Sequence, residues 1–152
     1  MIIFHIITYT SAQAMDKKFL FNFIKEHKYA VLATIANNNK PEAAFVGIAV
    51  NSDLRIIFDT VSDSRKYKNL LENPRIAFVI GWESEQTIQY EGIARVLDKN
   101  ELDDLLPVYF NTFPDGRYRL QNWPNIAYFS VKPVWIRYSD FNDPQRIEEI
   151  NF

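Results

Sequence analysis

The chain has 152 residues, of which 47% are hydrophobic and 24% charged, so it can fold as one domain with a sizeable core. Its net charge of -2 gives no electrostatic attraction to nucleic acid, and no apolar run is long enough to span a membrane. Cysteine is absent and only two histidines occur, which excludes disulfides, thiolate catalysis and zinc–thiolate sites. We therefore expect a cytoplasmic protein without a bound metal.

The first 14 residues differ from the rest of the chain. Their apolar run is short, is broken by His5, and lacks the positive start of a signal peptide. Met15 is followed by Asp16, a good helix cap. We expect an N-terminal extension over residues 1–14 and one domain over residues 15–152, and either Met1 or Met15 can be the true start.

Strands dominate the remainder. After an amphipathic helix over residues 16–28, alternating and apolar runs predict strands over residues 29–35, 43–50, 54–59, 75–82, 86–97, 126–131 and 134–138. The strands over 43–50 and 75–82 are apolar at nearly every position, which is typical of strands buried on both faces. A single chain of this size has little to cover both faces, so we expect a homodimer.

Two further helices are expected between the strands. The first follows Ser64 and must end before Pro74. The second runs from Asn100, as cap, to Phe110, with an acidic first turn and Pro107 near its middle. Residues 111–125 are rich in Pro, Asn and Gly and predict a loop. Short helices around many strands indicate a mainly β, antiparallel barrel with peripheral helices.

The motif Ser64-Arg65-Lys66 places two cations in the first turn of its helix. The helix dipole disfavours cations there, but a bound anion reverses the sign. Free backbone N–H groups, the Ser64 hydroxyl, a guanidinium and an ammonium can together hold a phosphate. A solvated basic turn is the alternative, because Lys17 and Lys18 open another helix in the same way with no phosphate argument behind them.

The order of several short segments resembles the FMN-binding split-barrel family, the pyridoxamine 5′-phosphate oxidase-like proteins. The segments are Leu32-Ala33-Thr34, Pro41, Ile57-Phe58-Asp59-Thr60, Ser64-Arg65-Lys66, Asn73-Pro74-Arg75 and Gly92-Ile93-Ala94. The resemblance implies a six-stranded antiparallel split β-barrel with short flanking helices. It also implies a homodimer with FMN at the interface.

The resemblance assigns roles to individual residues. Arg65 and Lys66 would hold the FMN phosphate, with the Ser64 and Thr60 hydroxyls nearby. The ring would be bordered by the strand residues Phe45, Val46 and Gly47, by a polar side chain at Thr87 or Gln89, and by groups of the second subunit such as Trp123, Trp135 or Arg137. A glycine in the strand lets a flat ring approach closely.

Departures from the family pattern matter for the substrate. The true pyridoxamine phosphate oxidases carry Arg where this chain has Ala44 and Lys where it has Ala49. They also have Tyr at the position of Asp59 and an Arg-Leu-His segment near the C-terminus that is missing here. Neutral alanines cannot bind the phosphate of a vitamin B6 substrate, so the chain is expected to keep the cofactor site without the B6 site.

The expected function is therefore an FMN-dependent oxidoreductase acting on an unidentified small molecule. Its catalytic residues are unknown, since cysteine is absent and neither histidine lies near the motif. The alternatives are a non-catalytic protein that binds or senses flavin, deazaflavin or haem, and a barrel without a ligand. Haem is less favoured because His5 and His27 both fall outside the expected strands.

Overall fold

The computed structural model describes residues 15–152, so the extension expected over residues 1–14 lies outside the described residues. The elements in chain order are α1 (Lys17–Glu26), β1 (Tyr29–Ile35), β2 (Pro41–Gly47), β3 (Ala49–Val50), β4 (Ile56–Val61), α2 (Arg65–Glu72), β5 (Arg75–Ile80), β6 (Gln86–Val96), α3 (Lys99–Thr112), α4 (Gly116–Asn122), β7 (Ile126–Asp140) and β8 (Arg146–Asn151). None of these helices is long and apolar enough to cross a membrane.

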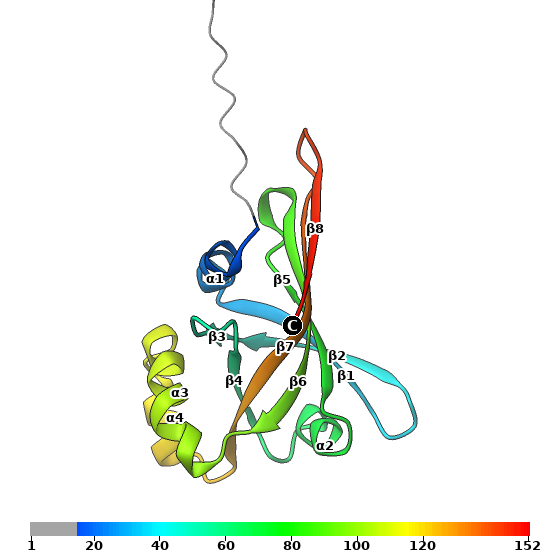
Figure 1. The fold of residues 1–152 in the computed structure, drawn as a ribbon. Coiled ribbons are helices and arrows are strands. Elements are labelled where there is room, and N and C mark those ends of the chain that lie inside the picture. The colour runs from blue at the N-terminus through cyan, green and yellow to red at the C-terminus, as the bar shows by residue number, and fades with distance from the viewer. Residues whose placement is uncertain (1–14) are drawn as a thin grey trace, which may run out of the picture.

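All eight strands join one antiparallel sheet. Along its hydrogen-bonded path the order is β2-β1-β5-β6-β7-β4-β3, and β8 pairs with β7 beside this path. The two ends of the path, β2 and β3, are consecutive in the chain and are separated only by Ile48. A sheet whose two edges are one continuous segment cannot lie flat, and Figure 1 shows the strands curled around one interior.

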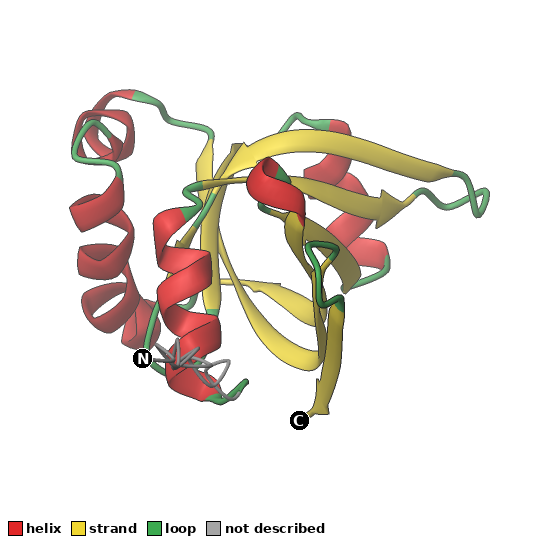
Figure 2. Ribbon diagram, turned by 90° about the horizontal axis from the view of Figure 1, so that it is seen from above, coloured by secondary structure: helices red, strands yellow, loops and turns green. Residues whose placement is uncertain are grey.

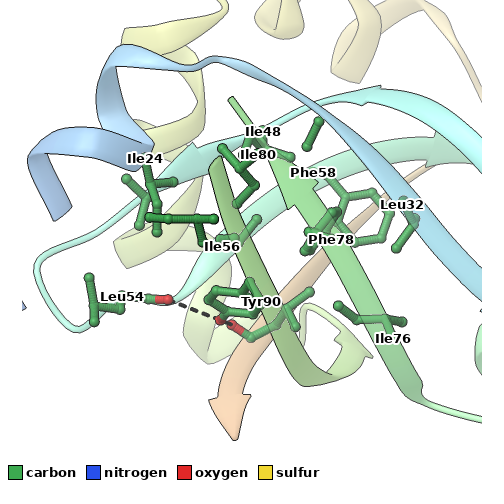
Figure 3. Packing of buried hydrophobic residues seen from close by; sticks show 14 of the residues in the cluster. Ile24, Leu32, Ile48, Leu54, Ile56, Phe58, Ile76, Phe78, Ile80 and Tyr90 are labelled. Atoms are coloured by element: carbon green, nitrogen blue, oxygen red, sulfur yellow. Dashed lines mark hydrogen bonds between the residues drawn. The ribbon is translucent and has the colours of Figure 1, made fainter. Parts of the chain in front are cut away.

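Apolar side chains fill that interior. Leu20, Phe23 and Ile24 of α1 and Leu70 of α2 are buried in the same cluster as the inward side chains of the strands, although α1 and α2 lie near opposite ends of the sheet (Figure 1). Figure 3 shows part of this cluster, with Tyr90 among aliphatic side chains from several strands. Burial of this area from water is the main stabilising contribution to the fold.

The remaining helices cover one outer region of the sheet. Leu105, Leu106 and Tyr109 of α3 are buried against Ile57 of β4 and Tyr128 of β7 in a second cluster. Figure 2 shows the helices at the outside of the curled strands. The outer face of β2, β1, β5 and β6 has no helix packed on it among the described residues.

The element count departs from the expectation in particular places. The structure has eight strands, whereas the sequence pattern predicted seven and the resemblance implied six. The strand expected over 43–50 is interrupted at Ile48, β8 was missed, and two expected strands are one. The segments expected over 126–131 and 134–138 form the single strand β7, with a register shift opposite Glu91 and Gly92. A proline-containing bulge of this kind allows the ladder to continue past Pro133.

The helix expectations also need correction. The helix expected from Asn100 to Phe110 runs from Lys99 to Thr112, and its cap is Asp98, whose carboxylate accepts from the backbone N–H groups of Asn100 and Glu101. The loop expected over 111–125 contains a fourth helix, α4.

The prediction that residues 43–50 and 75–82 are buried on both faces is wrong for a single chain. On β2, Phe45 is 63% exposed, and on β5, Val79 is 39% exposed. Both lie on the outer face that carries no helix, whereas Val46 and Phe78, on the opposite face, are buried. The apolar residues on the outer side of these strands are therefore exposed to solvent in a single chain.

The buried hydroxyl of Tyr90 on β6 links two other parts of the chain, strand β7 and the turn before β4. The Tyr90 hydroxyl lies 3.0 Å from the carbonyl oxygens of Leu54 and Val131, as Figure 3 shows for Leu54. Burial raises the pKa of Tyr90, so the hydroxyl stays protonated and donates. We expect Tyr90→Phe to lower the free energy of unfolding by about 1–2 kcal/mol in urea denaturation, since a buried hydrogen bond is lost.

Tyr118→Phe is the matched control, because Tyr118 is 64% exposed. It should leave the urea midpoint within the range of neutral surface changes, about 0.5 kcal/mol. Equal effects of the two substitutions would contradict the role given to Tyr90.

Candidate functional site

The turn between β4 and α2 brings together four of the predicted site residues. Ser64 is the cap of α2, and its Oγ accepts from the backbone N–H of Tyr67 at 3.2 Å. The Thr60 hydroxyl at the end of β4 lies 3.0 Å from the Ser64 hydroxyl. One hydroxyl donates to the other, which leaves one O–H for a ligand. Arg65 and Lys66 follow in the first turn of α2.

The carboxylate of Glu42 already lies beside the Arg65 guanidinium, where a bound phosphate would be expected. Arg65 Nη1 lies 3.1 Å from Glu42 Oε1, and the other oxygen of Glu42 accepts from Asn69 at 3.0 Å. Asn69 also donates to Thr34 Oγ1 at 3.0 Å. This network from β1, β2 and α2 borders a cavity of about 110 Å³ that Lys66 also lines. Glu42 therefore neutralises part of the positive charge that a phosphate would use.

The donor set still fits a phosphate. The Arg65 side chain is 75% exposed, whereas that of Glu42 is 14% exposed and is held by Asn69. The guanidinium can turn toward a ligand without loss of packing, and its exposure to solvent weakens its attraction to Glu42. A dianion held by a guanidinium, an ammonium, a hydroxyl and the helix N–H groups gains more than that pair.

The β2 residues assigned to the flavin ring have three different surroundings. Phe45 projects outward and stacks on Tyr29, with ring centroids 5.1 Å apart. Val46 points into the core. Gly47 is approached by a ring of this same chain, because a Cβ there would lie 2.7 Å from Cζ of Phe113. The close approach expected for a flavin at Gly47 is thus made by Phe113.

Thr87 and Gln89 lie on β6, away from the phosphate turn. The turn follows β4, which pairs with residues 126–131 of β7, whereas Thr87 and Gln89 pair with Ser139 and Arg137 toward the other end of β7. Gln89 is exposed on the outer face opposite Val79 of β5 and Arg137 of β7. Within one chain these residues and the β4–α2 turn do not form one site.

The Asp59 side chain binds helix α4 and does not point to the β4–α2 turn. Its carboxylate accepts from Arg119 Nε of α4 at 2.8 Å, and Arg119 also donates to the Tyr109 hydroxyl at 3.3 Å. Burial raises the pKa of Tyr109, and it raises the pKa of Tyr128 to about 12. Neither phenol ionises near neutral pH. The contact between Arg119 and Asp59 ties α4 to the sheet.

Several residues of these surroundings were not found from the sequence. Glu42 and Asn69 complete the network around Arg65, and Phe113 covers Gly47. His27 lies beside Phe45 in a separate cavity, although its position outside the strands led us to set it aside. The glycine before Trp82 was the sequence feature that could have indicated this turn, since Gly81 adopts a left-handed conformation. Residues 15–152 contain no cluster of three or more side chains able to hold a metal ion.

Comparison with known proteins identifies a family. Residues 17–140 match the family model described as Pyridoxamine 5′-phosphate oxidase. A pyridoxine/pyridoxamine 5′-phosphate oxidase from Ehrlichia chaffeensis is 33% identical over 93 residues, which is 60% of this chain and 45% of that protein. The chain thus spans about half the length of the curated relatives that it matches.

Solved structures show the same fold. A haem-binding protein from Mycobacterium smegmatis superimposes with a TM-score of 0.77 at 15% identity, over 92% of this chain and 60% of that one. A pyridoxamine 5′-phosphate oxidase-related, FMN-binding protein from Nostoc punctiforme gives a TM-score of 0.60 at 16% identity, over 82% of this chain and 86% of that one. At these identities the likeness establishes the split-barrel fold and leaves the ligand open.

The contact between Gly47 and Phe113 can be tested directly. We expect Gly47→Ala to lower the free energy of unfolding by about 1–3 kcal/mol, because the new Cβ forces the Phe113 ring out of place. In a Phe113→Ala background the same substitution should cost little. A double-mutant cycle measured by urea denaturation gives this coupling, and additive effects would mean that Phe113 does not constrain Gly47.

Proposed function

Because the chain belongs to the pyridoxamine 5′-phosphate oxidase family, we propose that it binds FMN and acts as a flavin-dependent oxidoreductase on a small molecule other than a B6 phosphate. The observation that carries the proposal is the β4–α2 turn, where Thr60, Ser64, Arg65 and Lys66 meet at a helix start. When bound, FMN supplies the electron transfer, and the protein supplies binding, orientation and electrostatics.

The turn would hold the phosphate end of the cofactor. Arg65 offers a planar fork and Lys66 a point charge, and the first N–H groups of α2 add hydrogen bonds to the same place. Arg65 must leave Glu42 to do so, which its exposure permits. Phe45, on the outer face of the adjacent strand β2, would lie along the ring of the cofactor.

Two positions argue against a B6 phosphate as the substrate. Ala44 borders the cavity beside Arg65, and Ala49 is 4% exposed against the cluster under α3. Neither alanine offers a charge or a hydrogen bond donor where the true oxidases are expected to have Arg and Lys. The substrate is therefore a different small molecule.

We further propose a homodimer that covers the outer face of β2, β1, β5 and β6. Ladder partners lie on the same face of a sheet, so Phe45, Val31, Val79 and Gln89 form one outward row. Exposed apolar side chains on this face include Tyr29, Ile35, Phe45, Val79 and Ile93. A contiguous apolar face of this kind is typical of an interface, and an obligate dimer would bury about 2,000 Å² or more in total.

A two-fold axis near the middle strand of this face would also complete the cofactor site. Beyond β6 the sheet continues into β7, so an axis along β5 would place β2 of one subunit opposite β7 of the other. Trp135 and Arg137 lie on β7 in register with Glu91 and Gln89. Such packing would bring an aromatic ring and a cation of the second subunit, together with its β6 residues Thr87 and Gln89, toward the flavin.

The dimer proposal predicts the effect of a charge at its centre. We expect Val79→Arg to yield monomers in size-exclusion chromatography with light scattering, because an unpaired cation in a buried apolar interface is costly. Leu120→Arg, on exposed α4, is the control and should remain dimeric. A wild-type protein that is monomeric at micromolar concentration would contradict the dimer.

The phosphate site predicts the effect of removing its guanidinium. We expect Arg65→Ala to weaken FMN binding about 30- to 1000-fold in a fluorescence titration, because a charge-assisted contact to a dianion is lost. Glu42→Gln should strengthen FMN binding several-fold, since Arg65 then has no competing carboxylate. Lys17→Ala, in the first turn of α1, is the matched control and should leave the affinity unchanged.

The same preparation tests the activity. The purified protein should carry flavin absorption that bleaches with a reduced nicotinamide cofactor. Flavin absorption that does not bleach would support a carrier in place of an enzyme. A haem Soret band with no flavin, or equal flavin affinities of the Arg65 and Lys17 variants, would contradict the proposed cofactor site.

A further inference from the structure

A second cavity, of about 460 Å³, lies where α1 leads into β1 and where β5 ends. It is lined by the rings of Tyr29, Phe45 and Trp82 and by the polar side chains of His27, Lys28 and Glu83. It shares no residue with the cavity beside Arg65, so it is separate from the phosphate turn.

The aromatic walls of this cavity are exposed in the single chain, and Tyr29 and Phe45 also lie on the outer face that the proposed dimer would cover. Tyr29 is 42% exposed, Phe45 63% and Trp82 50%. Tyr29 and Phe45 stack with an interplanar angle of 24°, which forms a continuous apolar wall. Lys28 Nζ lies 5.4 Å from the centroid of the Tyr29 ring, on the rim. Exposed flat rings around a cavity of this size favour a planar apolar ligand.

His27 is held in one orientation at the edge of the cavity. Its Nδ1 lies 2.7 Å from the Phe23 carbonyl oxygen, and its ring stacks on that of Phe23 at 4.4 Å. Gly81, with φ of +67°, makes room for both rings, because a Cβ there would lie 2.9 Å from Phe23 and 3.1 Å from His27. A left-handed glycine is thus needed to seat the imidazole.

This orientation decides what the second ring nitrogen can do. A carbonyl oxygen only accepts, so Nδ1 carries the hydrogen and Nε2 of the neutral ring is an acceptor. Nε2 lies 3.8 Å from the Glu83 carboxylate and forms an ion pair with it when the ring is protonated, so a ligand donor meets two acceptors here only while the ring is neutral. Termination of α1 explains the bond of Nδ1 to the helix carbonyl, but it explains neither the position of Nε2 nor the three exposed rings.

We propose that this cavity binds a planar aromatic small molecule that carries a hydroxyl or ring N–H group, with His27 Nε2 as the acceptor and Tyr29, Phe45 and Trp82 as the walls. Two acceptors at one edge of an aromatic cavity select a donor on the ligand. Phe45 also borders the proposed flavin ring, so the molecule would be the reaction partner of the flavin. This last step rests on the proposed function, and the binding itself does not.

The test compares two probes that differ only in the donor. The protein is titrated with 2-naphthol and with 2-methoxynaphthalene, and binding is followed by probe fluorescence and by the NMR signals of the His27 ring. We expect 2-naphthol to bind about tenfold more tightly, which corresponds to one hydrogen bond of about 1.4 kcal/mol. Equal affinities for the two probes would overturn the role of Nε2.

Variants separate the acceptor from the walls. His27→Asn keeps a donor for the Phe23 carbonyl and removes Nε2, so it should abolish the preference for 2-naphthol without changing the affinity for 2-methoxynaphthalene. Trp82→Ala should weaken both probes. Tyr118→Ala, at an exposed aromatic residue of α4, is the control and should weaken neither. Thermal unfolding of each variant verifies that it is folded.

Addition of saturating FMN distinguishes this proposal from the previous one. If FMN displaces 2-naphthol, the cavity is the flavin's own ring site, and a separate ligand site is overturned. If both bind together, the reaction-partner site is supported. If FMN does not bind and the preference for 2-naphthol remains, the cavity proposal stands and only the proposed cofactor fails.

Discussion

The whole architecture depends on one constraint, which is that residues 41–50 supply both edges of the sheet. β2 pairs with β1 and β3 pairs with β4, and Ile48 is the only residue between them. The Ile48 N–H still donates to the Lys28 carbonyl at 2.9 Å, so the crossing is tied to the start of β1. The sheet must curl, and the curl creates a closed interior and an outer face that no helix of the described residues covers.

Local pattern was enough for much of this fold, and its failures have physical causes. β6 alternates so regularly that the strand was predicted, and its residues Ile88, Tyr90 and Ala94 are buried on one face. β8 alternates in burial, but four of its six residues are charged or carry an amide, so hydrophobicity carried little signal. α4 is rich in long polar residues and begins with Gly116, whose small size admits Phe110 and hides the helix in the sequence.

The candidate site divides in the same way. The Ser64-Arg65-Lys66 turn is contiguous, so its cap and cations could be predicted from neighbours in the chain. Glu42 lies 23 residues away from Arg65 and meets it only because β2 returns beside α2. His27 is brought to Phe45 by the pairing of β1 with β2, which helix and strand patterns do not specify. Contacts between residues far apart in the chain depend on the topology of the sheet, which a short sequence motif does not specify.

The bond between Glu42 and Arg65 has a consequence for ligand choice. Because a carboxylate already sits against the guanidinium, entry of an anion is an exchange, and the incoming group must outcompete one negative charge fixed by Asn69. A phosphate monoester, with close to two charges near neutral pH, gains from the exchange. A phosphodiester or sulfonate brings a single charge and gains little. If the turn holds a phosphate as proposed, the internal carboxylate would act as a valence filter that favours terminal phosphates over singly charged anions of similar size.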